Sequence, residues 1–214
     1  MRQEYPGPQE YPGRIRSQHR RDTSTAGVEG NAKLTAMTGA VLLLGFAVEG
    51  FTILQVHRLL AIHFFVGFLL IGPVLLKIGS TLYRFVRYYT GSLAYVRKGP
   101  PAPVLRVLGP LVILTSVAVL GTGVALAVVG PRNGPWLFLH KATFILWFGV
   151  MTIHVLNHAP RLPRMLLARA GHGDDAARVG GGSARWLALA ISLAAGAGVA
   201  AMTVQLTGKW QFGF

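Results

Sequence analysis

Five long apolar runs constrain the fold of this 214-residue chain more than any other feature. They lie at about 34–56, 59–82, 105–129, 137–157 and 186–206. Each run reaches the ~20 residues that an α-helix needs to cross the hydrocarbon core of a bilayer. Because no water is available there, backbone polar groups must be bonded within each segment, which predicts helices. The sequence therefore predicts an all-α integral membrane protein in contact with membrane lipid.

The composition supports this class and excludes several others. Hydrophobic residues make up 52% of the chain and charged residues 13%, and the mean hydropathy is +0.48, which is too apolar for a soluble domain. The net charge of +14 is gathered in blocks between the apolar runs, so we expect no nucleic acid partner. The absence of cysteine excludes disulfides, thiolate-ligated iron–sulfur clusters and covalently attached c-type haem.

The basic residues predict the orientation. Most Lys and Arg residues lie in the N-terminal segment and in the connections after the second and fourth runs. Positive charge gathers on the cytoplasmic side of membrane proteins, which predicts a cytoplasmic N-terminus and an extracytoplasmic C-terminus. The abundance of Ala, Gly, Arg and Val indicates a bacterial source, so we expect a multi-pass protein of the bacterial cytoplasmic (inner) membrane.

Composition shifts divide the chain into four parts. Residues 1–33 are rich in Pro, Gly and Arg and predict a disordered cytoplasmic tail. Residues 34–165 hold four helices, which predict a haem-binding transmembrane bundle for the reasons given below. The glycine-rich residues 166–185 predict a flexible cytoplasmic linker, and residues 186–214 a fifth transmembrane helix with a short outer C-terminus. This fifth helix has no histidine, so we expect it to lie apart from any chemistry.

An internal repeat relates the second and fourth apolar runs. With an offset of 77 residues, His63 falls on His140 and Lys77 falls on His154. The repeat predicts two related helical hairpins, in which the second and fourth helices run parallel. His63 and His140 would then lie at matched depths near the outer side of the membrane.

The histidines favour haem as a ligand. His140 and His154 are fourteen residues apart, so they share one helix face and are ~21 Å apart along the axis. Imidazole is the usual axial ligand of b-type haem, and a haem with two such ligands needs one from each of two neighbouring helices. His63 with His140 meets that need, and His57 is the alternative partner of His140. Opposite His154 stands Lys77, so a second haem there remains an open alternative.

The spacing of His140, His154 and His158 resembles that of the di-haem cytochrome b superfamily of bacterial membrane proteins. This group includes cytochrome b-561-like proteins and the cytochrome b subunits of hydrogenases and formate dehydrogenases. The resemblance covers about residues 35–165 and implies a bundle of four or five helices with one or two b haems. It implies iron ligation by His63, His140 and His154, and electron transfer between quinone and a partner redox protein on the extracytoplasmic side. Lys77 departs from the pattern.

Other functions remain open alternatives. The chain has no flavin, nicotinamide or iron–sulfur motif, which favours an electron-transfer subunit over a self-sufficient enzyme. A cofactor-free small transporter, a scaffold subunit and a haem-binding membrane sensor are the alternatives. Glu49 is an acid within the first apolar run, which marks it as a functional residue. It would either relay protons to an outer quinone site or pair with Arg58 or His57.

Overall fold

The computed structural model describes residues 12–100, 103–132, 134–158 and 181–210, with the backbone alone for residues 12–26. These residues are helical and include no strand. The helices are α1 (Pro12–Leu54), α2 (Val56–Tyr89), α3 (Leu93–Lys98), α4 (Pro103–Val129), α5 (Gly134–His158) and α7 (Gly182–Thr203), followed by the 3-10 helix η2 (Val204–Trp210).

Five of the helical segments are long and apolar enough to cross a membrane. They are Gly27–Leu54, Val56–Tyr89, Pro103–Val129, Gly134–His158 and Gly182–Trp210. Large apolar side chains are exposed along them, including Leu44, Leu75 and Phe148, as expected for surfaces that contact lipid. The predicted all-α, multi-pass membrane fold is confirmed.

The first helix is longer than the sequence predicted. The tail was expected to be irregular through residue 33, whereas α1 begins at Pro12. Proline suits the first position of a helix because its φ angle is already helical, and no glycine interrupts the residues between Gly13 and Gly27. Residues 1–11 and most of the predicted linker, residues 166–180, lie outside the described residues. The end of that linker, from Gly182, already belongs to α7.

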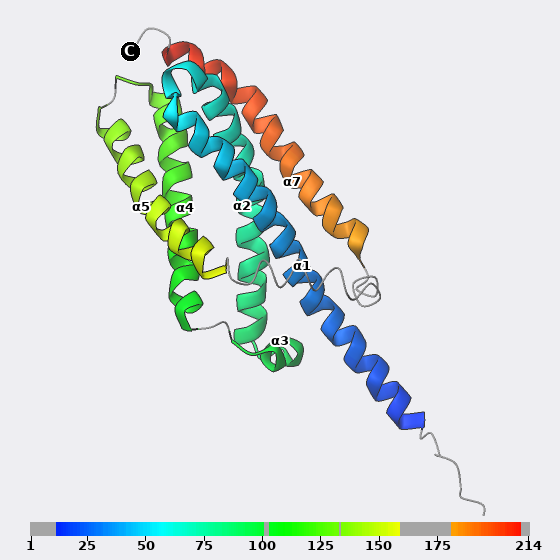
Figure 1. The fold of residues 1–214 in the computed structure, drawn as a ribbon. Coiled ribbons are helices and arrows are strands. Elements are labelled where there is room, and N and C mark those ends of the chain that lie inside the picture. Colours follow the sequence, from blue (N-terminus) through cyan, green and yellow to red (C-terminus); the bar gives the residue numbers. More distant parts are fainter. Residues whose placement is uncertain (1–11, 101–102, 133, 159–180, 211–214) are drawn as a thin grey trace, which may run out of the picture.

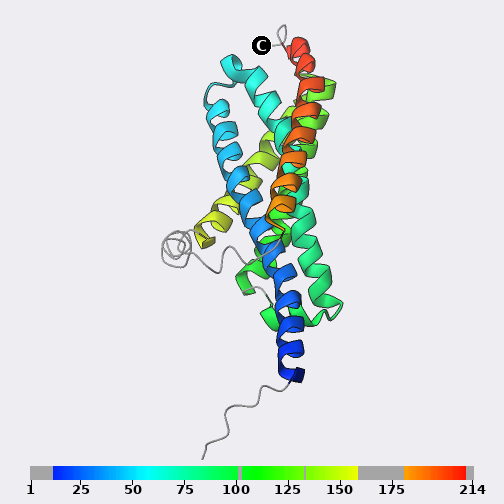
Figure 2. The ribbon, with the colours of Figure 1, turned by 90° about the vertical axis from the view of Figure 1, so that its right-hand side faces the viewer.

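Two antiparallel hairpins form the bundle, as Figure 1 shows. Helices α1 and α2 make the first hairpin and turn at Gln55, and α4 and α5 make the second. Helices α2 and α4 join the hairpins in the middle of the bundle, and α7 runs along α2 (Figures 1 and 2). Both hairpin turns and η2 lie at one end, here called the turn end. The short helix α3 lies at the opposite end, here called the α3 end.

Glycine allows α7 to lie directly against the backbone of α2. A Cβ atom on Gly72 would overlap the carbonyl oxygen of Ser192, and one on Gly196 would overlap that of Leu69. Small residues of this kind let membrane helices approach closely, where packing rather than the hydrophobic effect holds them together. The fifth helix was expected to lie apart from any chemistry, but it packs on the helix that carries His63.

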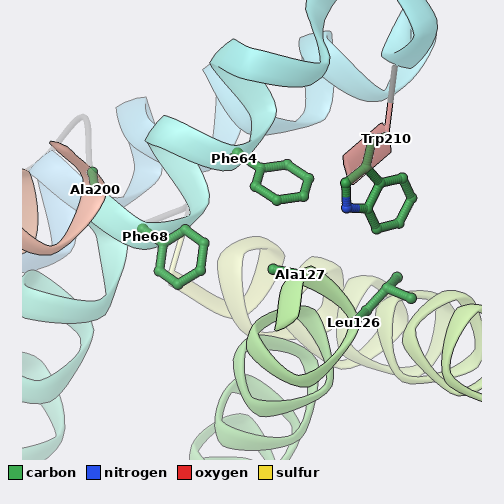
Figure 3. Packing of buried hydrophobic residues seen from close by; sticks show 6 residues of the cluster. All are labelled: Phe64, Phe68, Leu126, Ala127, Ala200 and Trp210. Carbon is green, nitrogen blue, oxygen red and sulfur yellow. The ribbon is translucent and has the colours of Figure 1, made fainter. Parts of the chain in front are cut away.

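An apolar cluster connects α2, α4, α7 and η2 towards the turn end. Its buried members are Phe64, Phe68, Leu126, Ala127, Ala200 and Trp210 (Figure 3). The ring of Trp210 meets that of Phe64 edge-on, with 5.6 Å between the ring centroids. The cluster therefore fixes the C-terminal η2 helix next to His63, the residue before Phe64.

Candidate functional site

The structure places near the turn end the two histidines that the repeat put at matched depths. His63 on α2 and His140 on α5 each lie about two turns from the turn-end start of their helix. Both side chains are half-buried. The two hairpins therefore each supply one imidazole to the interior of the bundle.

A threonine on α1 orients the His63 ring. Thr52 is 1% exposed, and its hydroxyl donates to the carbonyl oxygen of Glu49 at 2.6 Å. The single hydroxyl hydrogen is thereby used, so the Thr52 oxygen accepts a hydrogen bond from Nδ1–H of His63 at 3.0 Å. A proton on Nδ1 leaves the lone pair on Nε2, the nitrogen that can bind a metal.

A threonine on α4 orients the His140 ring in the same way. The Thr122 hydroxyl donates to the carbonyl oxygen of Ala118 at 2.8 Å, and its oxygen lies 3.2 Å from Nδ1 of His140. The ring itself rests on Gly123, where an added Cβ would lie 3.0 Å from Cε1 of the imidazole. The same Thr122 oxygen lies 2.9 Å from Oγ1 of Thr143 on α5. In the tautomer in which Nδ1 of His140 donates to Thr122, the lone pair is on Nε2.

The two hairpins therefore contain the same polar pair, a threonine on the first helix and a histidine on the second. Thr52 and Thr122 do not stand out in the sequence, because threonine and histidine are separated by 11 residues in one hairpin and by 18 in the other. No repeat with a single offset aligns both. A hydrogen bond to Nδ1 that fixes the tautomer is the usual support of a metal-binding histidine.

Glu49 also contacts the His63 ring. Its Oε1 lies 3.0 Å from Nδ1 of His63, and its Oε2 is buried with no hydrogen-bond partner in the described part of the chain. Gly67 makes room for this carboxyl group, because a Cβ there would lie 3.2 Å from Oε1. Glu49 therefore contacts His63, whereas the partners expected from the sequence were Arg58 or His57.

His57, the alternative ligand, lies in the first turn of α2 and is exposed. The backbone departs from helical geometry at Leu59, with φ −106° and ψ 19°. This kink falls between His57 and His63, so the two rings do not follow one regular helix. The threonine contact that orients an imidazole belongs to His63.

The α3 end holds the second pair of polar residues from the repeat. Lys77 donates to the carbonyl oxygen of Thr35 at 2.5 Å, and its Nζ lies 2.8 Å from where a Cβ on Gly39 would be. The His154 ring packs against the ring of His158, with centroids 4.6 Å apart, and its Nδ1 is buried without a hydrogen-bond partner among the described residues. In that part of the chain, no hydroxyl group orients either Lys77 or His154.

The register of the hairpins explains this difference. In α1, Thr38 precedes Thr52 by fourteen residues, and in the antiparallel α2, Lys77 follows His63 by fourteen. Thr38 is therefore level with Lys77, as Thr52 is level with His63. Thr38 is 0% exposed and donates to its own helix at Leu34, so a hydroxyl oxygen is present there without an imidazole to accept from.

The second hairpin has the opposite defect. In α4, Leu108 precedes Thr122 by fourteen residues, and in α5, His154 follows His140 by fourteen. Leucine thus occupies the level at which a threonine would orient His154, which explains the partnerless Nδ1. The α3 end is an incomplete copy of the turn end.

Trp147 lies midway between His140 and His154 of α5, seven residues from each. It is buried, and its indole N–H donates to Oγ of Ser116 at 3.0 Å. Its ring packs against Phe46 of α1, with centroids 4.7 Å apart. Trp147, which the sequence assigned to packing, therefore lies with Phe46 in an apolar layer. This layer separates the polar groups of the turn end from those of the α3 end.

No family model matches the sequence, and no curated protein or solved structure matches it. Within the described ranges, three or more His, Cys, Asp or Glu side chains nowhere gather into a group that could hold a bare metal ion. The candidate site consists of two half-buried imidazoles, His63 and His140, each with Nδ1 beside a threonine hydroxyl group.

Proposed function

We propose that this protein is a b-type haem subunit that passes electrons between quinone and a partner redox protein. The observation that carries the proposal is the pair of imidazoles at the turn end, each oriented by a buried threonine. His63 and His140 would be the two axial ligands through Nε2. Support for this ligand set comes from its symmetry, because the same threonine–histidine pair occurs in both hairpins.

The surroundings of the two imidazoles suit a haem. Its macrocycle is large and apolar, and the cluster with Phe64, Phe68 and Leu126 lies next to His63. Bound haem supplies one-electron redox chemistry, and the protein contributes its binding and orientation. The turn-end site would therefore offer the haem two nitrogen ligands and apolar walls. A second haem at His154 would need a partner that Lys77 does not provide.

The proposal includes a location and an orientation, a bacterial cytoplasmic membrane with the turn end on the extracytoplasmic side. The α3 end carries the basic residues expected on the cytoplasmic side, namely Arg84, Arg87, Arg97, Lys98 and Arg106. Near the turn end, the haem would exchange electrons with an extracytoplasmic redox protein, and the quinone would arrive from the bilayer. By this proposal, the protein would resemble the di-haem cytochrome b superfamily but would have two imidazole ligands at the turn-end site only.

A reduced-minus-oxidised spectrum of protein purified from haem-replete cells tests the proposal. We expect a Soret band, a sharp α band and about one haem per chain, since one site has both ligands. His63→Ala and His140→Ala should each lose the low-spin spectrum. His57→Ala and His154→Ala are the matched controls and should keep it.

Two results would contradict the proposal. Wild-type protein without a Soret band would exclude haem binding altogether. Loss of the spectrum in His57→Ala, with retention in His63→Ala, would move the ligand to the exposed start of α2.

A further inference from the structure

A small basic pocket opens at the turn end, between the α4–α5 connection and η2. Its volume is about 300 Å³, and Val129, Gly130, Pro131, Arg132 and Lys209 line it. Gly130 has φ +90°, a conformation that favours glycine, and it ends α4. Lys209 reaches the same helix end and donates to the carbonyl oxygen of Val128 at 3.2 Å.

The charge of the pocket selects an anion. A guanidinium group from Arg132 and an ammonium group from Lys209 come together, and none of the five lining residues is acidic. Both groups form their strongest hydrogen bonds with carboxylate or phosphate oxygens. The ligand of this pocket should therefore carry one or two such groups.

The pocket lies in line with the two oriented imidazoles. Gly123 of α4 contacts the His140 ring, and the pocket residue Gly130 is seven residues further, ~10 Å along the helix and on nearly the same face. Between these levels lie Leu126 and Ala127 of the apolar cluster (Figure 3).

A second path connects the same groups on the other side of the cluster. Lys209 of the pocket precedes Trp210, whose ring packs on Phe64, the residue after His63. Towards the turn end, the two imidazoles are therefore followed by the apolar cluster and then by the cationic side chains of the pocket. Haem b has the same order of groups, with iron at its centre, an apolar macrocycle and two propionate carboxylates at one edge.

We propose that Arg132 and Lys209 bind the propionate carboxylates of the haem. This inference rests on the proposed function and adds the side chains that would fix which way the macrocycle points. It also gives α7 and η2 a role, because the contact of α7 with α2 and of Trp210 with Phe64 brings Lys209 to the end of α4.

The test compares two forms of the cofactor. Haem-free full-length protein in detergent is titrated with ferric haem b and with its dimethyl ester, in which both carboxylates are capped. We expect the wild type to bind the free acid at least about tenfold more tightly, since charged hydrogen bonds are lost with the ester. The double variant Arg132→Gln/Lys209→Gln should bind both forms with nearly equal affinity.

Two controls separate this result from general effects. Lys141→Gln removes an exposed cation from α5 outside the pocket lining and should keep the wild-type preference for the free acid. Equal affinity of wild type and double variant for the ester shows that the double variant is folded. If the double variant binds neither form, the single variants Arg132→Gln and Lys209→Gln are titrated instead. The inference would be overturned if both single variants kept the wild-type preference for the free acid over the ester.

The remaining outcomes distinguish this inference from the function on which it rests. Equal binding of both cofactor forms by the wild type would overturn the propionate site and leave haem binding standing. A double variant that keeps the wild-type preference for the free acid would also overturn the propionate site without overturning haem binding. The pocket would then bind another anion, such as lipid phosphate. Binding of neither form by the wild type would overturn both proposals.

Discussion

The two ends of the bundle carry related polar residues, yet only at the turn end does each hairpin hold a histidine beside a threonine in the described part of the chain. At the turn end, Thr52 and Thr122 orient His63 and His140 at 3.0 and 3.2 Å. At the α3 end, Lys77 is bonded to a backbone carbonyl oxygen of α1, and Nδ1 of His154 has no partner within the described residues. A histidine at an equivalent helix position is therefore not always oriented, because the neighbouring helix must also supply the hydroxyl group.

The two ends also differ in what covers them. Trp210 of η2 packs over Phe64 at the turn end, where it helps to bury the region beside His63. At the α3 end, the short helix α3 contacts α2 through Tyr95, whose ring meets Tyr83 edge-on at 6.1 Å. Burial raises the pKa of this Tyr95 side chain, so it stays a neutral hydroxyl group at physiological pH. The apolar cover lies next to the oriented imidazoles.

The largest expected effect is the construction of a second site at the α3 end. Lys77→His together with Leu108→Thr gives this end the two groups that it lacks, while Thr38 already supplies the other hydroxyl oxygen. We expect the haem content to rise from about one to about two per chain, measured by the pyridine haemochrome assay.

The single variants are the controls for this construction. Lys77→His should add little haem, because Leu108 still leaves His154 without an orienting hydroxyl group. Leu108→Thr should add none, because Lys77 remains. A full second haem in Lys77→His would show that orientation by threonine is not what separates the two ends.

The next effect concerns the contact that holds α7 and η2 in place. Gly196→Ala forces a Cβ atom into the carbonyl oxygen of Leu69, so the helices must separate. Such overpacking costs about 1–3 kcal/mol. Thermal unfolding in detergent, followed by circular dichroism, should show a lower midpoint. Gly198→Ala on the same helix meets nothing within 4 Å and should leave the midpoint unchanged or raise it, because alanine favours helix.

The smallest expected effect separates orientation from ligation. Thr122→Val removes the oxygen that accepts from Nδ1 of His140, at a cost of about 1–3 kcal/mol for the buried donor left behind. In haem-free protein, ¹⁵N NMR of the imidazoles should show the Nδ1–H tautomer of His140 losing its dominance. Thr152→Val is the matched control on α5, because within the described residues the Thr152 hydroxyl bonds only the carbonyl oxygen of Phe148 in its own helix. An unchanged His140 tautomer in Thr122→Val would remove the threonine from the site.

The equivalence of His63 with His140 and of Lys77 with His154 could be predicted from the offset of 77 residues. The orienting threonines could have been found from a second signal, the matching fourteen-residue spacings of Thr38 with Thr52 and of Lys77 with His63. That signal becomes meaningful only when α1 and α2 are known to be antiparallel and in this register. The helical start of α1 at Pro12 was not predicted, because a polar segment without apolar periodicity gives no sign of a helix.

The sequence by itself determined the five membrane-spanning helices, because backbone bonding and length leave an apolar run no other structure in a bilayer. The tertiary structure alone decided which faces of these helices meet. Apolar residues surround each membrane helix, so their pattern does not fix its rotation, and small residues and polar contacts do. Gly72 and Gly196 set α7 against α2, and Thr52 and Thr122 turn two imidazoles toward one interior.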